Sequence, residues 1–162
     1  MLQGIRTMTT WLAPLVLLFS LSLPVQAQDQ YTPPDPTPTT KTFGADTVHF
    51  SVFNTSFLSP EVARSYGITR GKDKFLINVA VQHRDGNQQQ AIRAEVSGTT
   101  SDLIHRTPLE FREVIEQNAI YYIAEFRLDT KEERRDFRLK VNTATRALPY
   151  DIQFNKKLYR EE

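Results

Sequence analysis

The stretch FLINVAVQ, residues 75–82, indicates the fold class, because its apolar side chains recur at every second position. A period of two places alternate side chains on opposite faces of a β-strand, so one face of this strand would be buried. Asp85-Gly86 follows and suits the positive φ angles of a tight hairpin turn. The alternation resumes over residues 92–97, so we expect 75–82 and 92–97 to pair as antiparallel strands. The expected inward residues of the two strands are Phe75, Ile77, Val79, Val81, Ile92, Ala94 and Val96.

The same alternation continues outward from this hairpin in both directions. It recurs in the runs 48–57, 109–116, 120–128, 137–141 and 150–158. About seven strands predict an all-β fold, an immunoglobulin-like antiparallel β-sandwich with one short helix. In the first run the apolar parity changes between Val52 and Phe53, which a β-bulge would explain. The charged segment DTKEERR, residues 129–135, is expected to be a solvated loop.

One short helix is predicted between the first two strands. Ser59 is a good N-cap, Pro60 suits the first helical position, and Glu61 favours the positive end of the helix dipole. Gly67 is placed to end the helix. We expect this helix of about two turns to cap one end of the sandwich, with Val62 and Tyr66 on its apolar side.

The N-terminal region has the organisation of an export signal. Arg6 precedes the uncharged apolar run Trp11–Leu23, and Val25-Gln26-Ala27 has small residues at the positions that signal peptidase reads. A membrane anchor is the alternative, but a span needs about 20 apolar residues. We therefore predict a signal peptide over 1–27 cleaved after Ala27, a Pro/Thr-rich spacer over 28–41, and a β-sandwich domain over 42–162. The expected location is the periplasm.

The composition narrows the function classes. The chain has 20 Lys and Arg residues against 19 Asp and Glu residues. One base, Arg6, lies in the predicted signal, so the exported part would be balanced, which gives no reason to expect nucleic acid as a partner. The chain has no cysteine, so neither a disulfide nor a lipid on an N-terminal cysteine is possible. Once the signal is removed, no integral membrane segment is expected.

No motif in the sequence predicts catalysis, a metal or a cofactor. His49, His83 and His105 are not at ligand spacings, and no serine lies in a nucleophile elbow. Glu113 is the one unusual carboxylate, because its parity points inward with Leu109 and Phe111. It either pairs with a base for structural reasons or is a perturbed catalytic carboxylate.

Two segments of the chain resemble a bacterial family known as domain of unknown function 4426. They are SVFNTSFLSPEVARSYGITRGKDKFLINVAV, residues 51–81, and LEFREVIEQNAIYYIAEFR, residues 109–127. The resemblance implies an all-β envelope protein of Gram-negative bacteria and no assigned activity. It suggests where a binding site would lie, at Asn54, Phe57, Ser59, Glu61, Tyr66, Arg70, Lys72, Arg112 and Glu113.

Three functions remain open at this level. The first is a non-enzymatic binding or interaction module that uses the non-strand excursion of residues 53–73, since binding residues are often on loops of a rigid scaffold. That excursion could instead only seal the end of the core. The second is an enzyme acting on small envelope substrates, built around Glu113 with Arg70 or Arg112. The third is an assembly factor that acts by strand addition, which requires a long unpaired edge.

Overall fold

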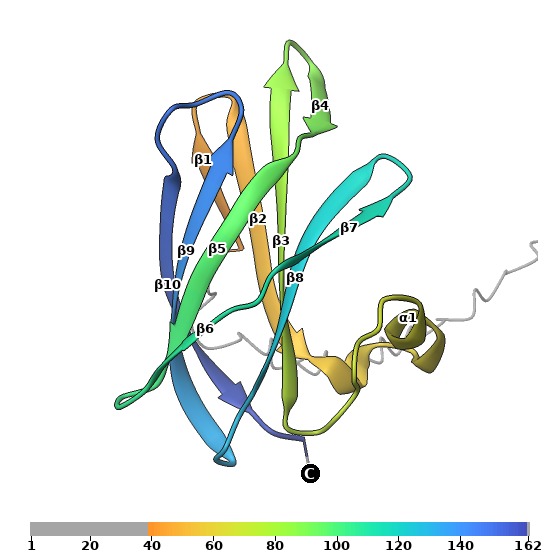
Figure 1. Ribbon diagram of the computed structural model, residues 1–162, viewed down its shortest axis with the longest axis vertical. Helices are drawn as coiled ribbons and strands as arrows, with labels where there is room; N and C mark the ends of the chain where they lie inside the picture. Colours follow the sequence, from red (N-terminus) through yellow and green to blue (C-terminus); the bar gives the residue numbers. More distant parts are fainter. Residues whose placement is uncertain (1–38, 162) are drawn as a thin grey trace, which may run out of the picture. The chain divides into compact units, whose positions relative to one another are not determined.

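The computed structural model describes residues 39–161 of the chain. The signal-peptide prediction and most of the predicted spacer lie outside the described residues. The described part is an antiparallel β-sandwich (Figure 1), so the predicted fold class is confirmed. The first strand already begins at Thr40. The one α-helix of the described residues has six residues, and no helix among residues 39–161 has the length and apolar character needed to cross a membrane.

The first sheet has six strands in the order β1-β2-β3-β8-β7, with β4 paired to β3. The strands are β1 (Thr40–Phe43), β2 (Asp46–Asn54), β3 (Lys74–Asp85), β4 (Gln88–Ala91), β7 (Arg112–Glu116) and β8 (Ala119–Arg127). The second sheet has the order β10-β9-β5-β6. Its strands are β5 (Ala94–Ser101), β6 (Arg106–Pro108), β9 (Glu132–Thr143) and β10 (Tyr150–Tyr159).

The seven longer strands have immunoglobulin connectivity. In chain order they are β2, β3, β5, β7, β8, β9 and β10, equivalent to strands A to G. The sheet orders β2-β3-β8-β7 and β10-β9-β5 then correspond to A-B-E-D and G-F-C. These seven are the strands that the alternation predicted. The three further strands have four residues or fewer and follow the sandwich edges and hairpins.

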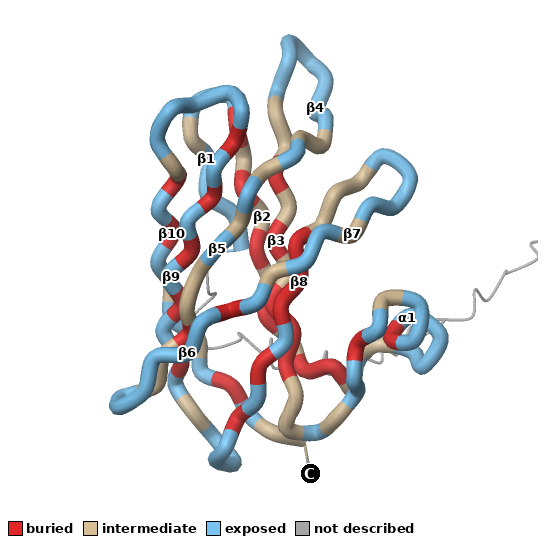
Figure 2. Tube along the Cα trace, viewed as in Figure 1, coloured by how far each residue is buried: buried red, intermediate tan, exposed pale blue. Residues whose placement is uncertain are grey.

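The inward residues of both sheets form one continuous core, which appears in Figure 2 as buried segments facing each other across the sandwich. Val79 and Val81 of β3 and Phe137 of β9 are completely inaccessible to solvent. Each such side chain contributes about 1.5–3 kcal/mol by leaving water. The parity predicted for β3, β8, β9 and β10 is therefore confirmed.

The predicted hairpin pairing was wrong. β3 does turn at Gly86, whose φ is +58°, but its hairpin partner is the short β4, with His83 opposite Gln90. The 94–101 strand crosses to the second sheet and pairs with β9. The alternation of apolar residues fixes which face is buried, and it does not fix which sheet a strand joins.

Two local predictions were also wrong. The pairing of β2 with β3 keeps one register from Asp46 to Asn54, so there is no bulge near Val52. Phe53 instead points to the outer face of the sheet, where it packs against other apolar residues. The segment 129–135 is not all solvated loop, because β9 begins at Glu132 and Arg135 is buried. The Nε atom of Arg135 lies 2.8 Å from Glu133 Oε1, and its Nη2 donates to the Arg127 carbonyl at 3.2 Å.

Candidate functional site

The excursion between β2 and β3 contains two short helices with matched caps. In the 3-10 helix η1 (Thr55–Phe57), Asn54 Oδ1 accepts hydrogen bonds from Ser56 N at 2.8 Å and Ser56 Oγ at 2.6 Å. In α1 (Pro60–Ser65), Ser59 Oγ accepts from Val62 N at 3.3 Å. Gly67 follows with a φ of +61°, a conformation that glycine adopts without strain. The predicted helix and its caps are therefore confirmed.

Thr55 ties the two ends of the excursion together. It is completely buried, and its Oγ1 accepts from Gly71 N at 3.0 Å and lies 3.2 Å from both the Thr69 and Lys74 carbonyl oxygens. Asn54 Nδ2 donates to the Lys72 carbonyl at 2.7 Å. The sequence alone did not reveal this role of Thr55. The only available signal was the position of the polar tripeptide 54–56 at the end of a strand. These bonds hold the excursion in one conformation.

The excursion covers the outer face of the six-stranded sheet, so the prediction that the helix caps an end of the sandwich was wrong. Ala63 and Ile68 of the excursion form a second, smaller core with Leu76 of β3 and Ile123 of β8. In Figure 1, α1 accordingly lies beside the sheet. The reason is that β3 and β8 have apolar residues at both parities. Their outer face would expose Leu76 and Ile123 to water without this cover.

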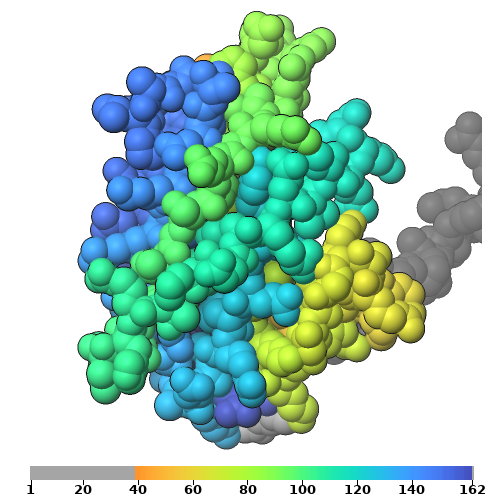
Figure 3. Space-filling view, viewed as in Figure 1, coloured from red at the N-terminus to blue at the C-terminus, as the bar shows by residue number. Residues whose placement is uncertain are grey.

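A pocket of about 150 Å³ lies where the excursion meets the sheet. Figure 3 shows the excursion, in yellow, against the segment that contains β7, in teal. The side chain of Glu116, at the end of β7, raises the pKa of Tyr66. The wall consists mainly of apolar side chains: Phe53, Leu58, Val62, Tyr66, Ile68, Leu76, Asn78, Val114, Glu116, Tyr121 and Ile123.

Asn78 is the uncharged amide in this wall. It lies on the outer face of β3, opposite Ser51 of β2 and Ile123 of β8. Its Oδ1 is shielded from solvent and has no hydrogen-bond partner among the described residues. Asn78 also borders an adjacent hollow with His49 and Ser51. Asn78 therefore has a buried hydrogen-bond acceptor that the described part of the protein does not satisfy.

The predicted site residues of the excursion divide between anchoring and exposed positions. Asn54 is buried and Ser59 caps the helix, so both stabilise the excursion itself. Arg70 Nη2 donates to the Ser56 carbonyl at 2.9 Å, and the Lys72 carbonyl also accepts from Glu161 N at 3.2 Å. Glu61 is exposed and lies 3.6 Å from Arg64. Phe57 is 75 % exposed, and Tyr66 lines the pocket.

The two predicted site residues of β7 are on opposite faces of the strand. Arg112 lies 3.7 Å from Glu125, whose other oxygen accepts from Thr69 N at 3.2 Å. Glu113 is on the same face of the sheet as Tyr122, as its parity predicted, but it is exposed to solvent; it accepts from the Tyr122 hydroxyl at 3.0 Å. Its ion-pair partner is Arg93, at 3.4 Å. Neither of these contacts of Glu113 involves Arg70 or Arg112, the bases expected beside it.

A second polar cluster, which sequence reasoning missed, is at the other end of β2. Asp46 is 3 % exposed and contacts His83 Nδ1 at 2.5 Å. Its Oδ2 accepts from the Tyr150 hydroxyl at 2.7 Å and from Thr145 Oγ1 at 2.8 Å. Burial raises the pKa of Asp46, but the bonds from His83, Tyr150 and Thr145 outweigh it and lower the pKa overall. The members are up to 104 residues apart, so no sequence motif marks them.

The histidines do not assemble a metal site in the described part of the chain. His83 is held by Asp46, His49 Nε2 lies 3.1 Å from Gln82 Oε1, and His105 is 3.7 Å from Asp102. No group of three or more metal-ligating side chains occurs among residues 39–161.

Fold and site together define an immunoglobulin-like sandwich with a capped excursion over one outer face. The sequence model of the family described as domain of unknown function DUF4426 matches residues 40–161, and the chain belongs to this family. The crystal structure of a DUF4426 family protein from Pseudomonas aeruginosa PAO1 is similar, with a TM-score of 0.65 and 36 % sequence identity. The match covers 76 % of this chain and 95 % of that one. No curated protein matches the chain.

Proposed function

We propose that this chain is an exported periplasmic binding module, without catalytic activity, that holds an envelope partner through the pocket under the excursion. The observation that carries the proposal is the pocket itself, an apolar hollow between Leu76 and Ile123 of the sheet and Val62 of the helix. Hollows of this kind, with few polar groups, are where proteins take ligands. The walls are held in place by the caps and by Thr55, so the pocket is formed before any partner arrives.

The size of the pocket suits one side chain of a partner. A cavity of about 150 Å³ lined by aliphatic and aromatic groups is large enough for a benzene ring. Protein interfaces commonly centre on one buried aromatic anchor surrounded by weaker contacts. Phe57 and Val62 are 75 % and 40 % exposed and provide apolar surface for such contacts on the excursion.

The geometry gives less support to an enzyme. Catalytic groups need to converge on a space where a substrate atom can sit. Arg70 and Arg112 bind Ser56 and Glu125, whereas Glu113 binds Tyr122 and Arg93. Burial and then the bond to Glu113 raise the pKa of Tyr122, which keeps its hydroxyl a donor. The Glu113 contacts therefore join β7 to β8 and support the sheet.

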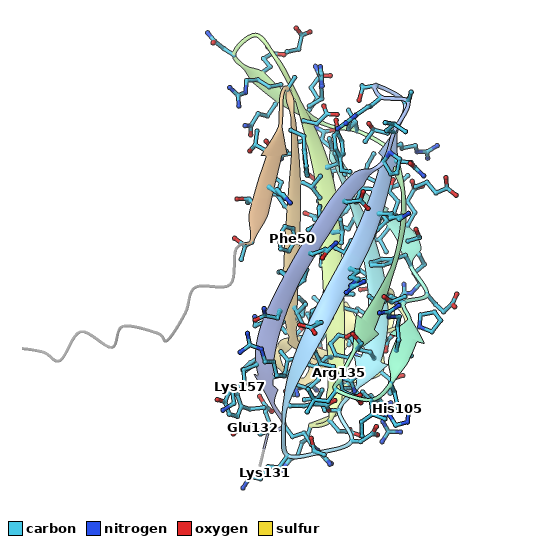
Figure 4. All side chains as sticks on the ribbon, turned by 90° about the vertical axis from the view of Figure 1, so that its left-hand side faces the viewer. Phe50, His105, Lys131, Glu132, Arg135 and Lys157 are labelled. Carbon is cyan, nitrogen blue, oxygen red and sulfur yellow. The ribbon has the colours of Figure 1, made fainter. Side chains whose placement is uncertain are left out.

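A function by strand addition is also less favoured, because the long edge strand β10 opposes pairing with another chain. The long edge strand β10 has Lys156 at an inward position, where Nζ donates to the Val52 carbonyl at 2.8 Å and burial lowers its pKa. An inward charge on an edge strand is a device that opposes pairing with another chain. On the outer side of β10, Lys157 forms an ion pair with Glu132 (Figure 4).

The experiment is a test of pocket occupancy with a small apolar probe. Benzene added to the purified protein should shift the methyl resonances of Leu76, Val114 and Ile123 in NMR spectra. Val62→Trp should block these shifts, because it places a large ring at the mouth of the pocket. Arg64→Trp is the matched control, since Arg64 is on the same helix and exposed to solvent. Equal shifts in both variants, or none in the wild type, would exclude the pocket as the binding site.

Export is tested separately from binding. Protein recovered from cells expressing the full chain should begin at Gln28 and fractionate with soluble periplasmic proteins, because the apolar run is shorter than a membrane span. N-terminal sequencing of the cell fractions measures both. An intact Met1 end recovered from membranes would contradict the proposal.

A further inference from the structure

We propose that the outer face of the second sheet binds an anionic lipid surface. A basic hollow on this face would hold lipid phosphates, and the loop between β5 and β6 would enter the lipid. This surface goes beyond the pocket of the proposed function, because the two are on different sheets and have no lining residue in common. Two features carry the inference: a group of bases around a hollow, and an apolar loop at its edge.

The basic hollow has a volume of about 460 Å³ and is lined by all four strands of the second sheet. Its bases are Arg106 of β6 and Arg138 and Lys140 of β9, and all three are exposed. The hydroxyls of Ser97 and Thr99 on β5 also line it and can donate to a ligand. Among residues 39–161, none of the three bases has a side-chain hydrogen bond or ion pair. A hollow lined by cations without counter-charges favours an anion.

The carboxylates of this face do not cancel the charge of the hollow. Asp151 is the one carboxylate of the lining, so the lining has three bases and one acid. Around it, the face has two further carboxylates, Asp136 and Glu95, and a further base, Arg134. Lys41 of β1 also reaches this side, since its Nζ donates to the Asp151 carbonyl at 3.4 Å. The surrounding charges therefore balance, and the lining keeps its positive excess.

The loop between β5 and β6, residues 102–105, presents two adjacent apolar side chains to water. Leu103 is 101 % exposed and Ile104 is 85 % exposed. Asp102 Oδ1 accepts hydrogen bonds from Ile104 N at 2.7 Å and from His105 N at 2.6 Å, which holds the loop in one turn. In Figure 1 this loop projects to the lower left, beyond β9 and β10. Large apolar side chains fixed in water at a projecting tip gain free energy by entering an apolar phase.

A lipid surface with phosphate groups is the occupant that uses both features. Arg106 directly follows the loop and lines the hollow, so insertion of the loop would bring the bases to the level of the headgroups. Arginine binds phosphate through paired hydrogen bonds, and bases near an anionic leaflet are attracted to it. A soluble phosphate compound would use the bases and leave Leu103 and Ile104 in water.

The test is sedimentation with lipid vesicles. The purified protein without residues 1–27 is used, so that the apolar run Trp11–Leu23 cannot itself enter the lipid. It should bind vesicles of phosphatidylglycerol and phosphatidylcholine in equal amounts about tenfold more tightly than vesicles of phosphatidylcholine alone, because only the former carry net negative charge.

The bases are tested by a double variant. Arg138→Gln with Lys140→Gln should weaken binding to the anionic vesicles by about tenfold or more. Arg64→Gln with Arg84→Gln is the matched control, since it removes the same charge from exposed positions of α1 and β3. The control should bind as the wild type does.

The loop is tested in the same way. Leu103→Ser with Ile104→Ser should abolish sedimentation with the anionic vesicles. Leu148→Ser is the control, because Leu148 is 67 % exposed in the loop at the opposite end of β9. Circular dichroism spectra check that each variant is folded, and titration of glycerol phosphate, followed by NMR, tests the soluble source of the same phosphate group.

The inference is supported if both double variants weaken vesicle binding and both controls keep it. Absence of vesicle binding by the wild type, or equal losses in variants and controls, would overturn it. Binding of glycerol phosphate that needs Arg138 and Lys140, together with vesicle binding that does not need the loop, would show a phosphate site and overturn the lipid surface. None of these outcomes involves the pocket under the excursion, so the proposed function is tested independently.

Discussion

The two faces of the six-stranded sheet are formed by the same strands but are covered to different extents. The inner face packs against the second sheet, and Val48, Val79 and Val81 have no solvent exposure. The outer face is covered only locally by the excursion, through Ala63 and Ile68. The inner core is completed by residues of both sheets, whereas the outer core keeps a hollow. The comparison teaches that burial is most complete on the inner face, and the proposed binding site is on the outer one.

The largest expected effect is the loss of the inner core. Val79→Asp should unfold the domain, because it buries an unpaired carboxylate at a completely inaccessible position. The expected cost is about 4 kcal/mol or more. Gln82→Glu is the control, with the same new charge at a partly exposed position on the outer face of the same strand. It should remain folded in circular dichroism spectra. If both variants unfold, the two faces are not different in the way stated here.

A smaller effect is expected from the outer core. Leu76→Ala should lower the free energy of unfolding by about 2–3 kcal/mol, at the lower end for a buried leucine. The existing hollow beside Leu76 means that fewer contacts are lost than in a close-packed site. Denaturant titration measures the change. A loss as large as that of Leu139→Ala, in the inner core and 1 % exposed, would contradict the distinction.

Acid should weaken the inner core before it affects the outer one. The lowered pKa of Asp46 means that its ionised form stabilises the fold above its ordinary pKa of 3.8. This contribution is lost as the pH falls through the lower pKa of the folded state. Hydrogen exchange should therefore rise first near Thr145 and Tyr150, which donate to Asp46, and later in α1. Asp46→Asn should remove most of this pH dependence, and an unchanged acid profile would contradict the assignment.

The smallest effect is expected at Asn78, whose side-chain oxygen is buried without a donor among the described residues. Asn78→Leu should leave the free energy of unfolding unchanged or raise it by about 1 kcal/mol, because an unsatisfied oxygen is replaced by an aliphatic group of similar size. Thermal unfolding against the wild type measures the difference. A loss above about 2 kcal/mol would mean that Asn78 supports the fold and has a structural partner.

The sequence predicted the strands and their inward faces because alternation is a local property. Phe75 to Val81 and Ile120 to Leu128 show the period of two directly, and each strand buries the predicted side. The helix was equally predictable, since the caps Ser59 and Gly67 act within a few residues. The exported location and the binding role are not settled by these patterns and stay as proposals with their own tests.

Only the tertiary structure decided where these elements meet. The 94–101 strand pairs with β9 in the second sheet, and the local alternation of its residues leaves the choice of sheet open. The Asp46 cluster and the pocket bring together residues that are far apart in the chain, such as Asp46 with Tyr150 and Tyr66 with Glu116. Local sequence determines the periodicity, the caps and the buried face of the longer strands, but not that of β7, where the predicted inward residue Ile115 is 52 % exposed. Long-range packing determines sheet order, and with it how much of an outer face the excursion covers.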